Sequence, residues 1–330
     1  MLTEADAIGP YSPQATPPFR VGWPHGRTAD AERSTSQAAP LLLGAPHLYH
    51  ASRLPILRGQ MSERFQKPPL TELVAELRWS TGMSTVGPSG PGPIFMLAAA
   101  QYEDFFTRIG AKVALLGYER IERLVPPGFL SAPFQVVYRF RKKAPEEGTS
   151  IYQVGGGVFT ANITPPYRSW AQFRPIVEQG VACLLETRNA SEREAPFTSA
   201  GLRYINAFGP RYTEGRSAGS FVQDVLGLRV SLPEALRSEL ADDAEMKLLL
   251  QLSTPLKSRQ QLNLVAAEGI VAGSGAVILD LHAVSETSIA PEKQQLMASF
   301  DLAHQAIHRV FVGLTTNISR LMEPIEEESS

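Results

Sequence analysis

Two kinds of hydrophobic periodicity alternate along residues 70–208, and this alternation limits the fold more than any other feature of the chain. Apolar residues two positions apart predict strands, whereas apolar residues three or four positions apart predict helices. The pattern predicts the order β-α-β-β-α-β. This order is typical of the ferredoxin-like, or split β-α-β, arrangement.

The first predicted strand follows Pro68 and Pro69, which favour extended backbone in the residues around them. Leu73, Val74 and Leu77 also permit a helix there, but the proline entry favours the strand. The predicted strands are 70–79, 134–142, 151–163 and 197–208, and the predicted helices are 101–124 and 167–187.

The second half of the chain begins with two short helical stretches, 219–227 and 233–240. Three strands follow, and their spacing predicts an antiparallel meander. These strands cover 245–254, 260–269 and 275–284. A long helix then runs from about Pro291 to Met322, with apolar residues at steps of three or four, which is typical of a helix packed along one face.

Together these elements predict an α+β protein, with antiparallel sheets and long helices packed on one face. We expect two closely joined sublobes. The first covers 61–213, and the second covers 214–330 with the short helices, the three-stranded meander and the long C-terminal helix.

Residues 1–60 differ in composition from the rest, because they contain eight prolines and no lysine. Such a segment cannot bury enough apolar surface to offset the entropy of ordering it. We interpret it as a disordered, partner-binding tail or as an extension that begins at an upstream start codon. The second interpretation is favoured, with Met61 as the translation start.

Composition excludes several classes of protein. A net charge of -2 gives no global field that would attract nucleic acid or a membrane surface. The single cysteine, Cys183, cannot form an intramolecular disulfide. No segment approaches the ~20 apolar residues of a membrane span, and the acidic N-terminus is not a signal peptide. We therefore expect a soluble, cytoplasmic protein without a membrane partner.

Four residues near the C-terminus are the candidates for catalysis: Asp280, His282, His304 and His308. His304 and His308 lie four apart on one helix face, a spacing that can chelate a metal. However, Gln305 stands where a metalloprotease has glutamate. Asp280 and His282 share a strand face, where a carboxylate can tune a base. The favoured interpretation is that Asp280 and His282 lie on a solvent-exposed strand face. His304 and His308 are then half-buried, and no metal and no cofactor are expected.

The binding candidates lie on two predicted strands. Arg139 and Arg141 alternate with Tyr138 and Phe140, so the cations and the aromatic rings point to opposite faces. This alternation disfavours RNA binding, in which rings and cations share a surface. The basic cluster is completed by Lys142 and Lys143.

Arg203 and Tyr204 are the binding candidates in the strand 197–208. An arginine in the middle of a strand commonly pairs with a carboxylate, and we expect Glu72 or Glu76 to be its partner. The triple glycine 155–157 predicts a bulge or a close approach of another backbone segment, because no Lys-Ser or Lys-Thr pair follows it as in a phosphate-binding loop.

Segments spread over 61–330 resemble a sporadically distributed bacterial protein family without an assigned function. The resemblance rests on Met61-Ser62-Glu63-Arg64-Phe65, on the sequence PPLTELVAELRW from Pro68, on GVFTAN from Gly157, on LRYIN from Leu202 and on LAH and FVGLT near the C-terminus. Residues 1–60 and the Gly- and Pro-rich stretch 81–93 fall outside this pattern. The resemblance implies no chemistry, but the family's scattered distribution implies a defence or toxin–antitoxin setting.

The sequence therefore favours a non-enzymatic binding or regulatory protein whose partner is another protein. A hydrolase or nuclease that uses the late histidines, and an RNA-binding protein, are the alternatives.

Overall fold

The computed structural model describes residues 65–81, 93–127, 132–143, 149–166, 169–241, 247–285 and 287–325, with side chains from residue 102 in the second range. All of them belong to one compact unit, Gly59–Ser330. The predicted tail 1–60 and most of the 81–93 stretch lie outside the described residues.

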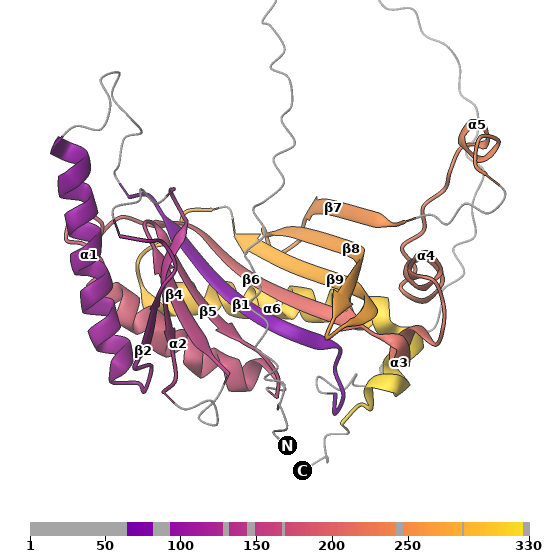
Figure 1. The fold of residues 1–330 in the computed structure, drawn as a ribbon, viewed down its shortest axis with the longest axis horizontal. Coiled ribbons are helices and arrows are strands. Elements are labelled where there is room, and N and C mark those ends of the chain that lie inside the picture. Colours follow the sequence, from indigo (N-terminus) through magenta and orange to yellow (C-terminus); the bar gives the residue numbers. More distant parts are fainter. Residues whose placement is uncertain are drawn as a thin grey trace, which may run out of the picture. The chain divides into compact units, whose positions relative to one another are not determined.

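Nine antiparallel strands form one continuous sheet in the order β2-β3-β4-β5-β1-β6-β9-β8-β7 (Figure 1). The strands are β1 (Leu70–Trp79), β2 (Arg120–Arg123), β3 (Val136–Arg141), β4 (Ile151–Gly155), β5 (Val158–Ile163), β6 (Phe197–Phe208), β7 (Leu249–Pro255), β8 (Gln261–Val271) and β9 (Ser274–Ser285). The predicted α+β class with an antiparallel sheet is confirmed.

Three long helices accompany the sheet: α1 (Pro93–Ala114), α2 (Trp170–Thr187) and α6 (Lys293–Thr315). The shorter ones are α3 (Pro210–Thr213), α4 (Ala218–Ser220), the π-helix η2 (Phe221–Val225), α5 (Glu234–Arg237) and the 3-10 helix η3 (Thr316–Met322). The predicted helix that reaches Met322 therefore ends as an α-helix at Thr315 and continues as η3.

The long helices pack on one face of the sheet, as predicted. α6 packs against β6 and β9, α2 packs against β5, and α1 contacts β3 and β4 (Figure 1). Alternate residues of each strand point to this face, such as Leu73 and Leu77 of β1 and Leu279 and Leu281 of β9, all fully buried. We call it the helix face, and the opposite side the open face.

The pairing of β6 with β9 joins strands from the two predicted sublobes into the same sheet. Nine residue pairs, from Ala200–Ser285 to Phe208–Val277, lie in continuous register. The sheet is therefore one continuous surface to which both halves of the chain contribute strands.

The helix predicted over 101–124 ends ten residues early, which corrects the predicted element order. α1 stops at Ala114, and Gly117 then turns the chain at a φ of +88°. Arg120–Arg123 forms the edge strand β2, paired with β3. Ile121 and Leu124 continue the helical spacing, but both are exposed, because the pairing with β3 overrides the local periodicity.

The strand predicted over 151–163 is two strands, and its glycines form a turn with a close backbone approach, the second of the two predicted alternatives, rather than a bulge. β4 pairs with β3, and after Gly156 and Gly157 the chain reverses into β5. Gly157 has a φ of +77°, and a Cβ there would lie 2.7 Å from the backbone oxygen of Trp79. Both the backbone angle and the close approach therefore require glycine.

Candidate functional site

The open face carries polar side chains on strand after strand. In register order, Arg139 of β3 lies opposite Gln153 of β4, which lies opposite Thr160 of β5, which in turn lies opposite Glu76 of β1. Beyond β1, Arg203 of β6 lies opposite His282 of β9. Because successive side chains alternate between faces, these residues all share the open face.

Arg203 and Asp280 form the strongest ion pair on this face. The Nε atom of Arg203 donates to both carboxylate oxygens of Asp280 at 2.9 Å. The hydrogen bond to Asp280 raises the pKa of Arg203, and the nearby charges of Glu72 and Glu76 act in the same direction. The predicted partner was one of these two glutamates. The actual partner is Asp280, which reaches Arg203 because β9, not only β1, flanks β6.

The acidic residues of β1 are held by neighbours on the same surface. The amide of Asn162 donates to Glu72 at 2.7 Å, and Arg78 donates to Glu76 at 2.7 Å. The Thr160 hydroxyl donates to Asn162 at 2.7 Å. These bonds link β5 and β1, so the centre of the open face is a hydrogen-bonded network rather than a set of isolated charges.

The ring of His282 lies over Gly201, which has no side chain. A Cβ on Gly201 would lie 2.6 Å from Nε2 of His282, so only glycine leaves room for the ring. Burial lowers the pKa of His282 below its ordinary value. The cations Arg203 and Arg78 lower this pKa further, and the carboxylates of Glu76 and Asp280 oppose the shift. His282 is therefore held neutral in the middle of an ion-paired surface.

The basic cluster lies at the β2 end of the open face. Three arginines share the carboxylate of Glu122: Arg139 at 3.4 Å, Arg141 at 3.1 Å and Arg120 at 3.4 Å. Phe140 points the other way and is buried against the helices. The cations and the rings thus lie on opposite faces, and among the described residues no ring stacks on Arg120, Arg139 or Arg141.

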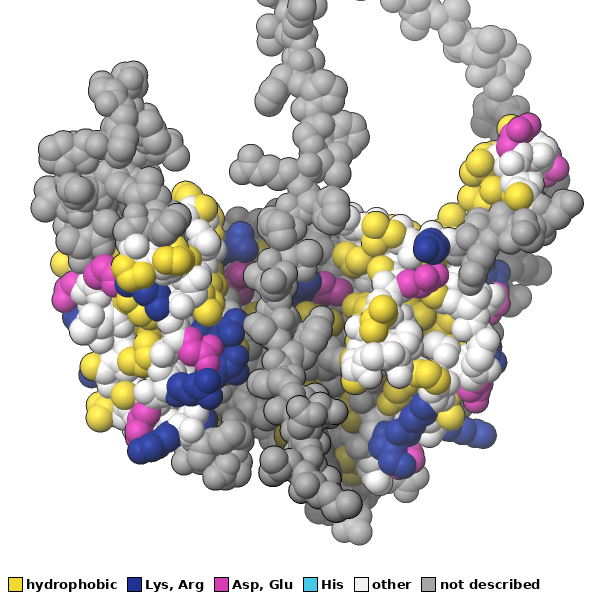
Figure 2. Space-filling model, viewed as in Figure 1, with side chains coloured by type: hydrophobic (Ala, Val, Ile, Leu, Met, Phe, Trp, Pro, Cys, Tyr) yellow, Lys and Arg dark blue, Asp and Glu magenta, His cyan; other side chains and the backbone are white. Residues whose placement is uncertain are grey.

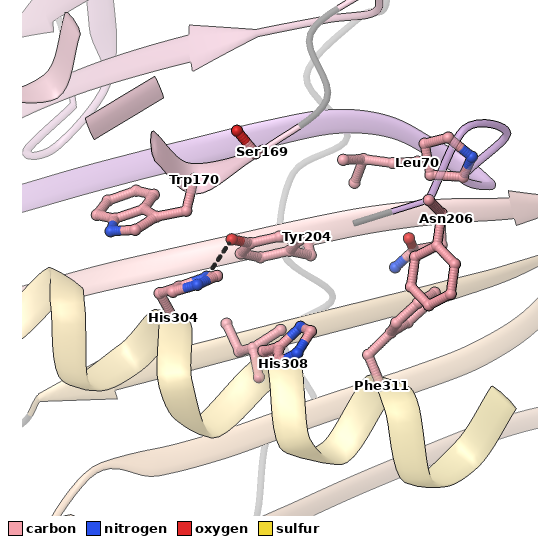
Figure 3. A pocket seen from close by; sticks show the side chains of 11 residues that line it. Leu70, Ser169, Trp170, Tyr204, Asn206, His304, His308 and Phe311 are labelled. Carbon is pink, nitrogen blue, oxygen red and sulfur yellow. Dashed lines mark hydrogen bonds between the residues drawn. The ribbon is translucent and has the colours of Figure 1, made fainter. Parts of the chain in front are cut away.

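The two helix histidines lie on the helix face, beside a small hollow of about 60 Å³ (Figure 3). Aromatic and aliphatic side chains dominate its wall, and its described lining residues include no Asp, Glu, Lys or Arg. The lining residues are Phe65, Pro68, Leu70, Ser169, Trp170, Tyr204, Asn206, His304, Ile307, His308 and Phe311.

His304 is fixed from two sides. Its Nδ1 lies 2.7 Å from the hydroxyl of Tyr204, and its ring stacks on Trp170 with centroids 5.4 Å apart and an interplanar angle of 16° (Figure 3). Asp301 accepts a hydrogen bond from Nε1 of Trp170 at 2.8 Å and pairs with Arg174. The ring of His308 lies 5.8 Å from that of His304. The hollow is large enough for one or two water molecules.

The four catalytic candidates are divided between the two faces of the sheet. Tyr204, which contacts His304, and Arg203, which binds Asp280, are consecutive residues of β6 and point to opposite sides. The sheet therefore separates Asp280 and His282 from His304 and His308, and no single reacting atom can touch all four. Among the described residues, no three His, Cys, Asp or Glu side chains are grouped so as to hold a metal ion.

The sequence interpretation missed a buried polar cluster at the end of β1. Glu192, 5% exposed, accepts hydrogen bonds of 2.6 Å from Nε1 of Trp79 and from the hydroxyl of Tyr102. The guanidinium of Arg188, 1% exposed, lies over the rings of Trp79 and Phe197. Buried charges of this kind interrupt no periodic pattern, so nothing in the sequence marks them. The cluster faces the helices and holds the loop after α2 against β1.

Within the described ranges, no helix combines the length and the apolar character that a membrane span requires. Comparison with protein families, with curated proteins and with solved structures yields no match.

Proposed function

We propose that this chain is a non-catalytic binding protein that recognises a protein partner through the open face of its sheet. The observation that supports the proposal is the distribution of charge on that face. Acidic and basic side chains lie side by side there, at the β2 end around Glu122 (Figure 2) and again on β1, β6 and β9, and among the described residues every long helix packs on the opposite side.

The mixture of signs favours a protein over a nucleic acid. Affinity for a phosphate backbone comes from Lys and Arg side chains that neutralise phosphates, whereas here Glu72, Glu76 and Asp280 lie at the centre of the face. A polypeptide offers both signs of charge and backbone groups, so it complements such a surface. The basic residues Arg139 and Arg141 share Glu122 with each other, which reduces the field available to RNA.

The separation of the acid and base candidates favours binding over catalysis. General acid–base chemistry needs its groups within hydrogen-bond reach of the same substrate. Asp280 is engaged by Arg203, and the helix histidines lie beyond the sheet. The family resemblance implies a defence or toxin–antitoxin setting, in which a protein of this kind would hold a toxin or regulator.

A charge swap tests the proposal without removing the ion pair. The double variant Arg203→Asp/Asp280→Arg retains an internal pair but inverts the polarity of the open face. Tagged wild type and variant are compared by affinity capture from the source cells with quantitative mass spectrometry. The partner captured by the wild type is expected to fall at least tenfold with the variant.

The matched control is the swap Lys112→Glu/Glu186→Lys, which inverts an exposed ion pair between α1 and α2 on the other side of the molecule. It is expected to capture the partner as the wild type does. Equal capture by both swaps, or no protein enriched by the wild type, would contradict the proposal. Thermal melting of all three proteins confirms that they are folded.

A further inference from the structure

β7 is the outermost strand at one end of the sheet, and it is uncovered. It pairs with β8 on one side through seven residue pairs, and no described strand pairs with its other side. Six of its seven residues are exposed; the side chain of Leu249 is 73% exposed and that of Leu252 is 42% exposed. Alternate backbone N–H and C=O groups of β7 therefore point away from the sheet.

The edge at the other end of the sheet has the opposite character. β2 is four residues long, and three of them are charged: Arg120, Glu122 and Arg123. Short, charged edges prevent strand pairing between molecules. β7 has seven residues, no charged side chain and a single proline, Pro255, at its last position, so charge protects one edge of the sheet and not the other.

Exposed apolar side chains are concentrated around β7. Of the twelve large hydrophobic residues that are exposed among the described residues, seven lie between positions 230 and 271: Val230, Leu236, Leu240, Leu249, Leu252, Ile270 and Val271. Three of them lie in the segment that leads to β7, and four lie on β7 and at the end of the adjoining β8. The exposed leucines of the edge itself are the apolar side chains that a second strand would cover.

We propose that β7 is a dimer interface at which two copies of this chain pair their β7 strands antiparallel. An antiparallel pair of identical strands has two-fold symmetry, the commonest symmetry of protein dimers. With Leu252 on the axis, Gln251 lies opposite Ser253 of the second copy, and Leu249 lies opposite its Pro255.

The charges of the two edge strands explain why a second copy is expected to pair with β7 and not with β2. Self-pairing of β2 about its centre would place Arg120 opposite Arg123, and like charges directly opposite destabilise a ladder. Self-pairing of β7 brings together no charged side chains, although Pro255 at its end lacks an N–H and so removes one hydrogen bond at each end of the paired strands. The nearest cations are Lys247 and Lys257, which approach each other at the two ends of the paired strands, so the dimer is expected to strengthen at higher salt.

Cross-linking tests the register. Residues directly opposite in an antiparallel pair have Cβ atoms about 5 Å apart, close enough for a disulfide after slight adjustment. Full-length Leu252→Cys is expected to form a covalent dimer under mild oxidation. Leu302→Cys is the matched control, since this leucine of α6 is 46% exposed and is expected to remain uncross-linked. The native Cys183 is buried and does not interfere.

Sedimentation velocity tests the interface without a covalent bond. Wild type at micromolar concentration is expected to be a dimer, and Leu252→Lys is expected to raise the dissociation constant at least tenfold by placing two ammonium groups on the axis. Leu302→Lys is expected to remain dimeric, and circular dichroism checks that each variant is folded. A wild type that is monomeric at 100 times that concentration, or a Leu252→Lys variant that dimerises as the wild type does, would overturn the proposal.

Discussion

The two faces of the nine-stranded sheet are built from the same strands but perform different tasks. On β9, Leu279 and Leu281 enter the core beneath α6, while Asp280 and His282 lie on the open face. The helix face buries apolar area, which supplies most of the stabilisation. The open face instead carries hydrogen bonds and ion pairs, whose net contribution to stability is small. Stability and recognition are thus assigned to alternate residues of each strand.

The open face does have one structural task, because its polar pairs join neighbouring strands. Arg139 meets Glu122 across β3 and β2, and Arg203 meets Asp280 across β6 and β9. A shift of one residue in register would break every such pair and send charged groups into the core. The polar face therefore specifies the register of a sheet that the apolar face stabilises.

The largest difference between the faces is expected for two adjacent aliphatic residues of β9. Leu279 is fully buried under α6, whereas Ile278 is on the open face and only partly buried. Leu279→Ala is expected to lower the free energy of unfolding by about 3 kcal/mol because it opens a cavity, and Ile278→Ala by about 1 kcal/mol. Urea denaturation measures both, and equal losses would contradict the assignment of the faces.

A somewhat smaller loss of stability is expected at the buried polar cluster of Glu192 and Arg188 on the helix face. Glu192→Gln replaces a buried acceptor of two hydrogen bonds and removes the negative charge nearest Arg188. We expect a loss of about 2 kcal/mol in the free energy of unfolding. Glu194→Gln, at an exposed position of the same loop, serves as the control and is expected to stay within about 0.5 kcal/mol of the wild type.

On the open face, removing one partner of the Arg203–Asp280 ion pair is expected to change stability differently from removing both. Arg203→Leu leaves the carboxylate of Asp280 without its main partner and is expected to cost about 1 kcal/mol, since Arg203 is half exposed to water. Arg203→Leu/Asp280→Leu removes both charges and is expected to recover that loss, while partner capture still fails. A double variant less stable than either single variant would show that the pair itself stabilises the sheet.

The smallest expected effect is the contribution of His282 to the pH dependence of stability. The pKa of His282 in the folded protein is lowered, so below pH ~6.5 the unfolded chain binds more protons than the folded one. The stability that His282 contributes is present above this pH and decreases as the pH falls. We expect the wild type to lose more of its free energy of unfolding than His282→Asn between pH 7.5 and 5.5. The difference between their urea midpoints at each pH measures it, and a difference of opposite sign would refute it.

Much of the fold follows from periodicity in the sequence. The spacing in 275–284 places Asp280 and His282 on one strand face, and the structure has both on the open face. Periodicity predicts the wrong element where the pairing of strands determines the structure. Arg120–Arg123 continues the helical spacing of α1, yet it is a strand because β3 offers it a partner. The reversal at Gly157 depends on the nearby backbone of Trp79, which is distant in sequence.

The site was less predictable because its contacts join distant parts of the chain. The alternation of Arg139 with Phe140 correctly separates cations from rings. However, the pairing of Arg203 with Asp280, rather than with Glu72 or Glu76, depends on β9 lying next to β6. The contact between Tyr204 and His304 likewise depends on the placement of α6. No local pattern contains this information.

The position of β6 in the middle of the sheet constrains how the chain can be made. One edge of β6 pairs with β1, which precedes it, but the other edge pairs with β9, which a ribosome synthesises only after β7 and β8. A nascent chain that has just passed Phe208 therefore presents an open central strand to its surroundings. Its sheet closes only when Val277–Ser285 emerges from the ribosome, so translation arrest between these points is expected to produce a chaperone-dependent, protease-sensitive intermediate.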